Sequence, residues 1–236
     1  MLSSNVNFAT RSYEKELLDR NDIPFADIEQ NMRELNFINT HLGGHAITIA
    51  GFKKLLGNKK QITVCEIGCG GGDNLWAIYQ YCNKNNIAAS FIGIDINADC
   101  IAVAKSKLGA TNARLIVADY KSVHFNEDKP GIIFSSLFCH HFSNEELLFM
   151  LAWMKARAAD GFFINDLHRH PLAYYSIKFL SSIFSRSYLV KNDAPLSVKR
   201  GFKKKDWQQL MNKARIQQYH IYWKWAFRWL LVIANA

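Results

Sequence analysis

A glycine-rich segment that follows a short hydrophobic run is the strongest chemical signal in the chain. Within Val64–Asp73, the residues from Glu66 to Gly72 read E-x-G-x-G-x-G. A glycine turn between a strand and a helix lets a ligand approach backbone N–H groups closely. A dinucleotide-binding G-x-G-x-x-G would need glycine at position 73 or 75, where Asp73 and Leu75 stand, and the chain has no phosphate-binding G-x-x-x-x-G-K-[ST]. The spacing therefore argues against a nicotinamide dinucleotide and against a P-loop nucleotide.

Two histidine-bearing segments follow later hydrophobic runs and offer acid–base chemistry. Cys139–His141 comes after Ile132–Leu137, and Asp166–His170 comes after Gly161–Asn165. Histidine is the usual general base at neutral pH, and a phenol with a pKa of about 10 benefits from such a base. A capping or packing role is the alternative for each histidine. A metal site on the first segment is disfavoured, because adjacent residues do not easily converge on one ion and no second pair has metal-ligand spacing. We therefore expect no metal.

The alternation of short β-rich runs with amphipathic helices from Gln61 onward predicts the scaffold for these residues. Such alternation indicates parallel strands covered by helices on both faces. The expected strands are Ile62–Ile67, Ser90–Ile94, Ala113–Ala118, Ile132–Leu137 and Gly161–Asn165. The expected helices between them are Asn74–Cys82, Ala98–Leu108 and one that runs from a capping box at Ser143–Glu146 to about Lys155. A turn is expected at Asp128–Gly131.

The two ends of the chain complete the predicted fold. Residues 11–57 read as helical, with a break at Gly43-Gly44. After Pro171 we expect a helix to about Val190, a basic loop and a short helix near Trp207–Ala214. The runs Gln217–Trp223 and Phe227–Ile233 then suit an antiparallel hairpin at the sheet edge. The predicted fold is α/β: a Rossmann-like, doubly wound, seven-stranded, mostly parallel sheet, with residues 1–58 as an N-terminal helical cap on the domain formed by residues 59–236.

Across residues 61–166, the glycine segment and the strand ends resemble class I S-adenosylmethionine-dependent methyltransferases. Asp95 is similar to the acid that takes both ribose hydroxyls, because one carboxylate accepts two hydrogen bonds. Asp119 is similar to the acid that accepts from the adenine amino group, and Ile96 would pack against the adenine. Gly131 stands where the family has an acid. The positions that the resemblance assigns to the cofactor S-adenosylmethionine are Glu66, Gly68, Cys69, Gly70, Gly72, Asp95, Ile96, Ala118, Asp119, Tyr120, Ser136 and Leu137.

The same resemblance places both histidine-bearing segments at the pocket for the methyl acceptor. Methyl transfer is an in-line displacement, so the enzyme mainly aligns the nucleophile with the methyl group in a dry pocket. We expect His140 to be the first catalytic candidate and His168 the second, with His141 beside them and Asp166 orienting or polarising. Arg11 would clamp the methionine carboxylate if the N-terminal segment folds over the pocket; the alternative is a solvated arginine.

An aromatic stretch and a basic run in the last third of the chain bear on the acceptor. The aromatic residues from Tyr174 to Tyr188 suit either a helix that packs on the sheet or an apolar lid over an aromatic or lipid-like substrate. Asp166–Tyr175 resembles a narrower bacterial group assigned to polyketide, phenolic-lipid and aryl-polyene pigment pathways. The net charge is +9, but residues 1–176 carry −1 and residues 177–236 carry +10. The run Lys199–Lys205 reads as a solvated face, with anionic lipid and nucleic acid as alternatives.

We therefore expect a methyltransferase acting on a small hydrophobic acceptor, above all on an oxygen of an aromatic or polyketide-derived compound. Two alternatives stay open: an RNA or tRNA methyltransferase that uses the basic C-terminal face, and a non-catalytic cofactor-binding partner protein. A nucleic-acid substrate ranks behind a small molecule and is not expected, since base-modifying enzymes of this family usually carry Pro-Pro-Tyr or Pro-Cys, whereas the four prolines here are isolated and none precedes a cysteine.

The five cysteines and the N-terminal residues Met1–Asn5 bear on the cellular location of the protein. Five cysteines without a C-x-x-C pair indicate a reducing compartment, and Met1–Asn5 lacks the charged start of a secretory signal. A cytoplasmic protein is expected, with peripheral membrane contact through the basic C-terminal region left open and the oligomeric state undetermined.

Overall fold

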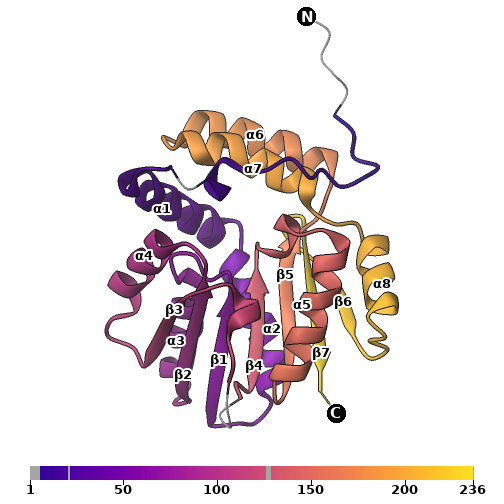
Figure 1. Ribbon diagram of the computed structural model, residues 1–236. Helices are drawn as coiled ribbons and strands as arrows, with labels where there is room; N and C mark the ends of the chain where they lie inside the picture. The colour runs from indigo at the N-terminus through magenta and orange to yellow at the C-terminus, as the bar shows by residue number, and fades with distance from the viewer. Residues whose placement is uncertain (1–5, 21, 126–128, 236) are drawn as a thin grey trace, which may run out of the picture.

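A seven-stranded sheet forms the centre of the computed structural model, which describes residues 6–20, 22–125 and 129–235 (Figure 1). The strands are β1 (Gln61–Ile67), β2 (Ala88–Asp95), β3 (Ala113–Val117), β4 (Ile132–Ser136), β5 (Gly161–Leu167), β6 (His220–Lys224) and β7 (Arg228–Ala234). Their order is β3-β2-β1-β4-β5-β7-β6. The first five are parallel, and β7 pairs antiparallel with β5 and β6. The predicted α/β sheet with a C-terminal hairpin is confirmed.

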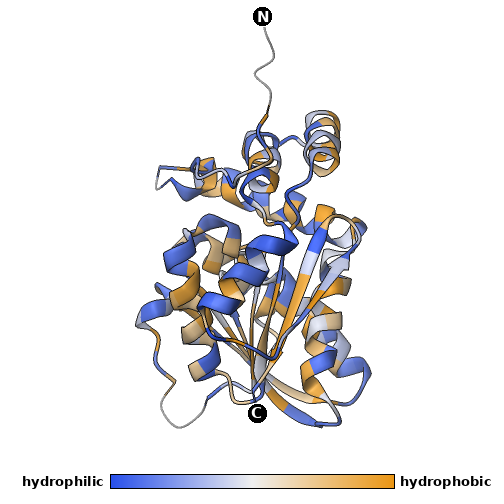
Figure 2. Cartoon of the chain, turned by 90° about the vertical axis from the view of Figure 1, so that its right-hand side faces the viewer, coloured by the Kyte–Doolittle hydropathy of each residue, from blue (hydrophilic) through white to orange (hydrophobic). Residues whose placement is uncertain are grey.

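Helices cover both faces of this sheet. They are α1 (Phe25–His41), α2 (Gly44–Leu56), α3 (Asp73–Lys84), α4 (Ala98–Leu108), α5 (Asn144–Arg157), α6 (Pro171–Phe184), α7 (Tyr188–Arg200) and α8 (Lys204–Lys213), with short 3-10 turns η1 (Leu17–Asp19), η2 (Tyr120–Ser122) and η3 (Cys139–His141). One buried cluster joins α2, α3 and α4 to one face, and a second joins α5 and α8 to the other. Figure 2 shows the hydrophobic strands between the two helix layers. The sheet order reverses between β1 and β4, where folds of this kind bind ligands.

A cap of helices lies across the carboxyl ends of the strands. Figure 1 shows α1, α6 and α7 above the sheet, with the N-terminal segment crossing them. The cap therefore combines the N-terminal segment and α1 with two helices that follow β5. Helix α2, which belongs to the predicted cap segment 1–58, packs instead on β5 and β7. The division between residues 58 and 59 stays a prediction.

The predicted single helix from Pro171 to about Val190, followed by a basic loop, is wrong. The chain breaks after Phe184, and α7 occupies the region expected to be a loop. Glu34 of α1 causes the break, because its carboxylate accepts the backbone N–H groups of Arg186 and Ser187 at 2.9 and 3.1 Å. The Ser187 hydroxyl then accepts from the backbone of Val190 and caps α7. A carboxylate about 150 residues away leaves no local signal in the sequence.

Other boundaries differ by small amounts. The helical pattern of residues 11–57 begins as α helix only at Phe25, and the hairpin strands end one residue later than expected, at Lys224 and Ala234. The capping box at Ser143 and Glu146 is present. Met1–Asn5 and Asp128, the first residue of the expected turn, lie outside the described residues. In the described part of the chain, no helix combines the length and the hydropathy needed to span a bilayer.

Candidate functional site

The glycine segment turns sharply between β1 and α3. Gly68, Gly70 and Gly72 have φ of +66°, +50° and +76°, which side chains rarely adopt. A Cβ on Gly68 would also lie 2.3 Å from the ring of Phe138, so only glycine fits there. Met32 of α1 covers the turn, since a Cβ on Gly70 would be 3.5 Å from its sulfur. The turn therefore has the glycine-dependent backbone expected from the sequence, and the approach of a ligand to it stays a prediction.

The two acids predicted to bind the nucleoside lie at the ends of β2 and β3. The Asp95 carboxylate accepts the backbone N–H groups of Gly70 and Asn97 at 2.8 and 2.9 Å, which ties it to the glycine turn. Burial raises the pKa of this carboxyl, while the two N–H donors lower it. Asp119 is exposed and accepts the N–H of Lys121, and Ile96 beside Asp95 is 72% exposed. An exposed isoleucine next to two strand-end acids fits a planar base and its ribose.

Glu66 lies behind the glycine turn and is 1% exposed. Its Oε1 accepts from the Asn74 side chain at 3.1 Å, whereas Oε2 has no partner among the described residues. Burial raises the pKa of Glu66 well above its ordinary value, with Asn74 acting in the opposite direction. A buried polar atom without a partner beside a glycine turn fits a site that takes a polar ligand.

Three other residues predicted to contact the cofactor have side chains that are buried or hydrogen-bonded within the protein. Tyr120 is buried with its ring 5.4 Å from that of Trp153, so it belongs to the core below β3. Cys69 is also buried. The Ser136 hydroxyl accepts from the amide of Asn165 at 3.3 Å. Ala118, between β3 and Asp119, is half-buried at the sheet edge.

A cavity of about 360 Å³ lies between the cap and the ends of β4 and β5. Most of its lining is apolar and comes from α1, α6, α7, the loop after β4 and the β6–β7 turn at residues 225–228. Representative apolar residues are Leu35, Ile38, Leu137, Ile177, Leu180 and Val190. Glu16, His140 and His141 form a polar patch in this lining. Leu137 lines the cavity while its neighbour Phe138 rests on Gly68, so one loop connects the cavity to the glycine turn.

His140 and Asp166 are brought together from the ends of neighbouring strands. The Nδ1–H of His140 donates to Asp166 Oδ1 at 2.8 Å, and its Nε2 faces Glu16 Oε1 at 3.4 Å. Burial alone would lower the pKa of His140, but the carboxylates of Asp166 and Glu16 outweigh it and raise the pKa to about 9. The same contact lowers the pKa of Asp166 against the effect of burial. At neutral pH the pair is therefore ionic.

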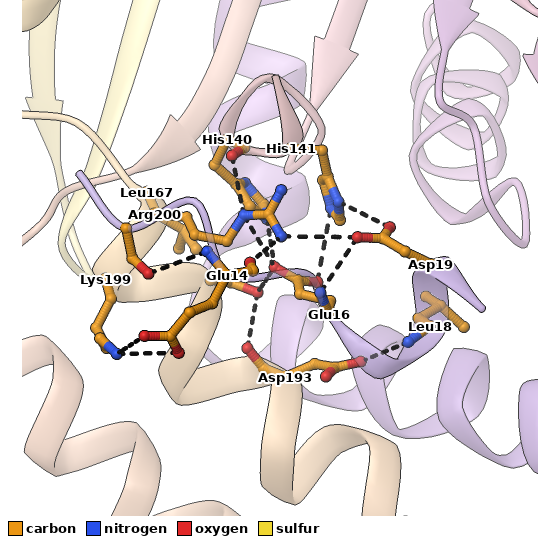
Figure 3. Close-up of polar contacts among 12 residues, drawn as sticks. Glu14, Glu16, Leu18, Asp19, His140, His141, Leu167, Asp193, Lys199 and Arg200 are labelled. Carbon is orange, nitrogen blue, oxygen red and sulfur yellow. Dashed lines mark hydrogen bonds and ion pairs between the residues drawn. The ribbon is translucent and has the colours of Figure 1, made fainter. Parts of the chain in front are cut away.

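His141 points toward the same carboxylate as His140 (Figure 3). Its Nε2 lies 3.6 Å from Glu16 Oε2, and its Nδ1 lies 3.1 Å from Asp19 Oδ1. Burial would raise the pKa of Glu16 and of Asp19, but the histidines lower both. We call Glu16, Asp19, His140, His141 and Asp166 the histidine–carboxylate cluster.

Arg11 is neither a carboxylate clamp nor a solvated arginine in this structure. Its guanidinium donates to the backbone carbonyls of Arg200, His140 and Phe142 and to the side chain of Asn144, at 2.9 to 3.2 Å. It is 9% exposed and lies outside the cavity lining. All its contacts are within the protein, so Arg11 fastens the N-terminal segment to the loop that carries His140.

The basic run is not a uniform solvated face either. Arg200 is 4% exposed and donates to the carbonyls of His140 and Glu14, at 3.1 and 2.7 Å. Lys204 and Lys205 are exposed on α8. One member of the run therefore supports the histidine–carboxylate cluster, which its sequence neighbourhood did not indicate.

His168, the second catalytic candidate, lies outside the cavity lining. It accepts from Trp223 Nε1 at 3.3 Å, and its ring lies 4.9 Å from that of Trp229. Burial, helped by the charges of His170 and Arg169, lowers its pKa to about 4. The structure thus separates His168 from His140, although both follow strand ends.

Glu16 and Asp19 are the functional candidates that the sequence did not reveal. Both lie at the η1 turn in the N-terminal segment, without a recognisable motif around them. Glu16 is 5% exposed although it precedes the first long helix. Because Glu16 contacts His140, 124 positions later in the chain, no local spacing of residues in the sequence indicates this contact.

Comparisons with known proteins agree with this geometry. Residues 64–161 match the sequence profile of a family described as a methyltransferase domain. Among solved structures, the plantazolicin methyltransferase BpumL in complex with SAH is 19% identical, with a TM-score of 0.65 over 90% of this chain and 89% of that one. Magnesium protoporphyrin IX methyltransferase from Synechocystis PCC 6803 with bound SAH is 16% identical, with a TM-score of 0.53 over 92% and 90%. No curated protein sequence matches the chain significantly.

A third solved structure, a putative O-methyltransferase from Nostoc punctiforme PCC 73102, is 14% identical with a TM-score of 0.59 over 86% of this chain and 59% of that one. The profile match confirms the predicted class of enzyme for residues 64–161, and the solved structures confirm its fold. The structures of this fold include complexes with SAH and with SAM, in agreement with the predicted cofactor.

Proposed function

We propose that this methyltransferase moves a methyl group from S-adenosylmethionine to an oxygen of a small, hydrophobic, aromatic acceptor that binds in the capped cavity. One observation carries the proposal: a mostly apolar cavity of about 360 Å³ has a polar patch containing His140, next to the loop that touches the glycine turn. Apolar cavities with a few placed polar groups are typical of small-molecule sites.

The residues at the carboxyl ends of β1, β2 and β3 suit the cofactor. The glycine turn offers its backbone to the methionine part, Asp95 suits the ribose, and Ile96 with Asp119 suits the adenine. S-adenosylmethionine supplies the electrophilic methyl group when it is bound there. This chain contributes position and exclusion of water, which displacement at a methyl carbon mainly requires.

His140 is the residue that we assign to the acceptor. Its Nδ1 is held by Asp166, which fixes the ring and leaves Nε2 facing Glu16 in the cavity lining. In the proposed step, Nε2 of an uncharged His140 ring would accept the proton of an acceptor hydroxyl. The acceptor oxygen would form the new bond to the methyl carbon as the carbon–sulfur bond breaks, with S-adenosylhomocysteine as the leaving group. Because the pKa of His140 is about 9, the ring is mostly charged at neutral pH and the rate should rise with pH up to about 9, where the uncharged ring is a well-matched base for a phenol with a pKa of about 10.

The cap favours a small molecule over a nucleic acid. The cavity is bounded by α1, α6 and α7, and its apolar side chains have no counterpart in a phosphate backbone. Two of the similar enzymes have structures whose names fit a heteroaromatic acceptor: BpumL with azolic desmethylPZN analogues and the magnesium protoporphyrin IX methyltransferase. We extend that acceptor class to this chain as part of the proposal.

Release of S-adenosylhomocysteine in the presence of a panel of hydrophobic phenols tests the function, with short RNA as the competing substrate. We expect turnover with at least one phenol and none with RNA. His140→Gln should lower kcat by about 10²- to 10⁴-fold, while His168→Gln, outside the cavity, should stay near wild type. Equal rates for wild type and His140→Gln, or turnover of RNA alone, would contradict the proposal.

A further inference from the structure

Two adjacent histidines and one glutamate converge in the cavity lining (Figure 3). Nε2 of His140 lies 3.4 Å from Glu16 Oε1, and Nε2 of His141 lies 3.6 Å from Glu16 Oε2. These three donor groups lie within 4.8 Å of one another. The sequence alone disfavours such convergence, because neighbouring residues have to point at one place. The η3 turn makes it occur: the two rings lie 4.5 Å apart and are inclined by only 33°.

The spacing differs from that of hydrogen-bonded pairs. Good N–H···O hydrogen bonds measure about 2.7–3.2 Å, shorter than both ring–carboxylate distances. Ligand atoms about 2.1 Å from one ion at tetrahedral angles lie about 3.4 Å from each other. The distance from each ring Nε2 to its facing Glu16 oxygen is close to this separation between two ligand atoms of one ion. Each carboxylate oxygen of Glu16 faces one ring.

The opposite side of each ring repeats the pattern of metal-binding histidines. Nδ1 of His140 is 2.8 Å from Asp166, and Nδ1 of His141 is 3.1 Å from Asp19. Metal-ligating histidines characteristically donate their other N–H to a carboxylate, which fixes the ring and its tautomer. Two independent carboxylate–histidine pairs aim at the same point here. Side-chain packing alone would not require two such carboxylate–histidine pairs.

The charge around this point also suits a cation. Three carboxylates of the histidine–carboxylate cluster surround the rings, and the Arg200 guanidinium lies 3.9 Å from Glu16 and 3.6 Å from Asp19. A bound ion would displace the proton of His140, and with neutral rings these side chains leave two negative charges, which a divalent ion neutralises. Glu16 Oε1 also accepts from the Ser197 hydroxyl at 2.7 Å.

We propose that Glu16, His140 and His141 bind one divalent transition-metal ion of the zinc class, with its open position facing the acceptor cavity. Cys139 is not a ligand, because its sulfur is buried against Ser135 and Met150. Nitrogen and carboxylate ligands in this number are typical of zinc and its neighbours among the transition metals.

The consequence for catalysis rests on the proposed function, whereas ion binding does not. Nε2 of His140 does not hold an ion and a proton together, so a bound ion replaces the base. An acceptor hydroxyl at the open position would lose its proton to solvent more readily, since divalent ions lower the pKa of bound oxygen ligands. The metal would thus serve acceptors that offer an oxygen ligand.

Equilibrium dialysis of EDTA-treated protein against Zn²⁺, with Co²⁺ as the spectroscopic probe, tests the site. We expect one ion per chain and visible Co²⁺ bands without a thiolate charge-transfer band. Glu16→Gln and His141→Ala should each weaken binding at least 100-fold. Asp166→Asn should weaken it about 10- to 100-fold through the ring that it orients. Glu14→Gln is the matched control, because Glu14 lies in the same segment but pairs with Lys199.

Several results would overturn the metal site. One is wild-type binding no tighter than that of a Glu16→Gln, His141→Ala double variant whose circular dichroism is unchanged. A thiolate band would assign the ion to a cysteine, and loss of binding in Glu14→Gln would indicate an unspecific acidic surface. Methyl transfer is not needed for the titration, so inactivity on the phenol panel counts against the proposed function alone.

Discussion

His140 and Asp166 form a buried ion pair that joins two neighbouring strand ends. The Nδ1–Oδ1 distance is 2.8 Å, and the two side chains are 3% and 0% exposed. Asp166 also accepts the backbone N–H groups of His140 and Leu167, at 3.3 and 2.7 Å. One carboxylate therefore fixes the ring, the loop that carries it and the end of β5. The orientation of His140 at the cavity depends on this carboxylate.

Asp166→Asn tests that dependence. The amide keeps the shape of the side chain but removes the charge that holds His140 in place, so kcat for a phenolic acceptor should fall about 10²-fold or more. The Kd for S-adenosylmethionine should stay within a factor of three, because Asp166 does not contact the glycine turn. Steady-state kinetics with cofactor titration measure both quantities. A variant with wild-type kcat would show that Asp166 has only a packing role.

Ser176→Trp tests the cavity as the acceptor site. Ser176 of α6 lines the cavity, and an indole there would fill much of its volume. The KM for a phenolic acceptor should rise more than tenfold while cofactor binding is unchanged. Ser182→Trp is the control, since Ser182 is on the same helix but exposed and absent from the cavity lining. Equal effects of the two substitutions would place the acceptor elsewhere.

Arg11→Ala distinguishes a structural role of Arg11 from a role in binding the cofactor. The substitution removes this donor from the buried carbonyls of Arg200 and His140 and from the partly buried carbonyl of Phe142, which should cost about 2–3 kcal/mol of unfolding free energy. Cofactor affinity should change little. Urea denaturation and calorimetry measure the two effects, with exposed Arg20→Ala as the control. A stable variant that has lost cofactor affinity would restore the carboxylate clamp expected from the sequence.

His168 predicts a specific acid sensitivity of the fold. Burial and neighbouring positive charges lower its pKa to about 4, against about 6.5 in an unfolded chain. The unfolded chain therefore binds the proton more readily than the folded chain. The stability that the uncharged His168 contributes is lost as the pH falls from about 6.5 toward 4. His168→Gln should show a shallower decline of unfolding free energy across this window than wild type. Urea denaturation at several pH values measures it, with exposed His220→Gln as the control. Parallel curves for His168→Gln and wild type would contradict the prediction.

Local features of the sequence were sufficient for the cofactor side of the site. The turn at Gly68–Gly72 is encoded by glycines that adopt positive φ, and the strand ends that carry Asp95 and Asp119 follow from short hydrophobic runs. The antiparallel hairpin at the sheet edge was predictable from two further runs. In each case, the residues that determine the structure are neighbours in the sequence.

The acceptor side depends on contacts that no local pattern contains. Glu16 reaches His140 across the fold, Glu34 breaks the chain before α7, and Arg11 binds the loop after β4. The cap is assembled from α1, α6 and α7, so its cavity exists only once α1 and the two helices that follow β5 have met. His140 was predictable as a candidate, whereas its partner Glu16 was not.

Calorimetric titration with S-adenosylmethionine tests the central claim most directly. The wild-type protein should bind one equivalent and should not bind NAD. Asp95→Ala should weaken the affinity at least tenfold, because it removes the carboxylate assigned to the ribose. Asp99→Ala, at the start of α4, should leave it unchanged. Absence of binding to S-adenosylmethionine, or an Asp95→Ala variant with wild-type affinity, would contradict a cofactor site at this edge of the sheet.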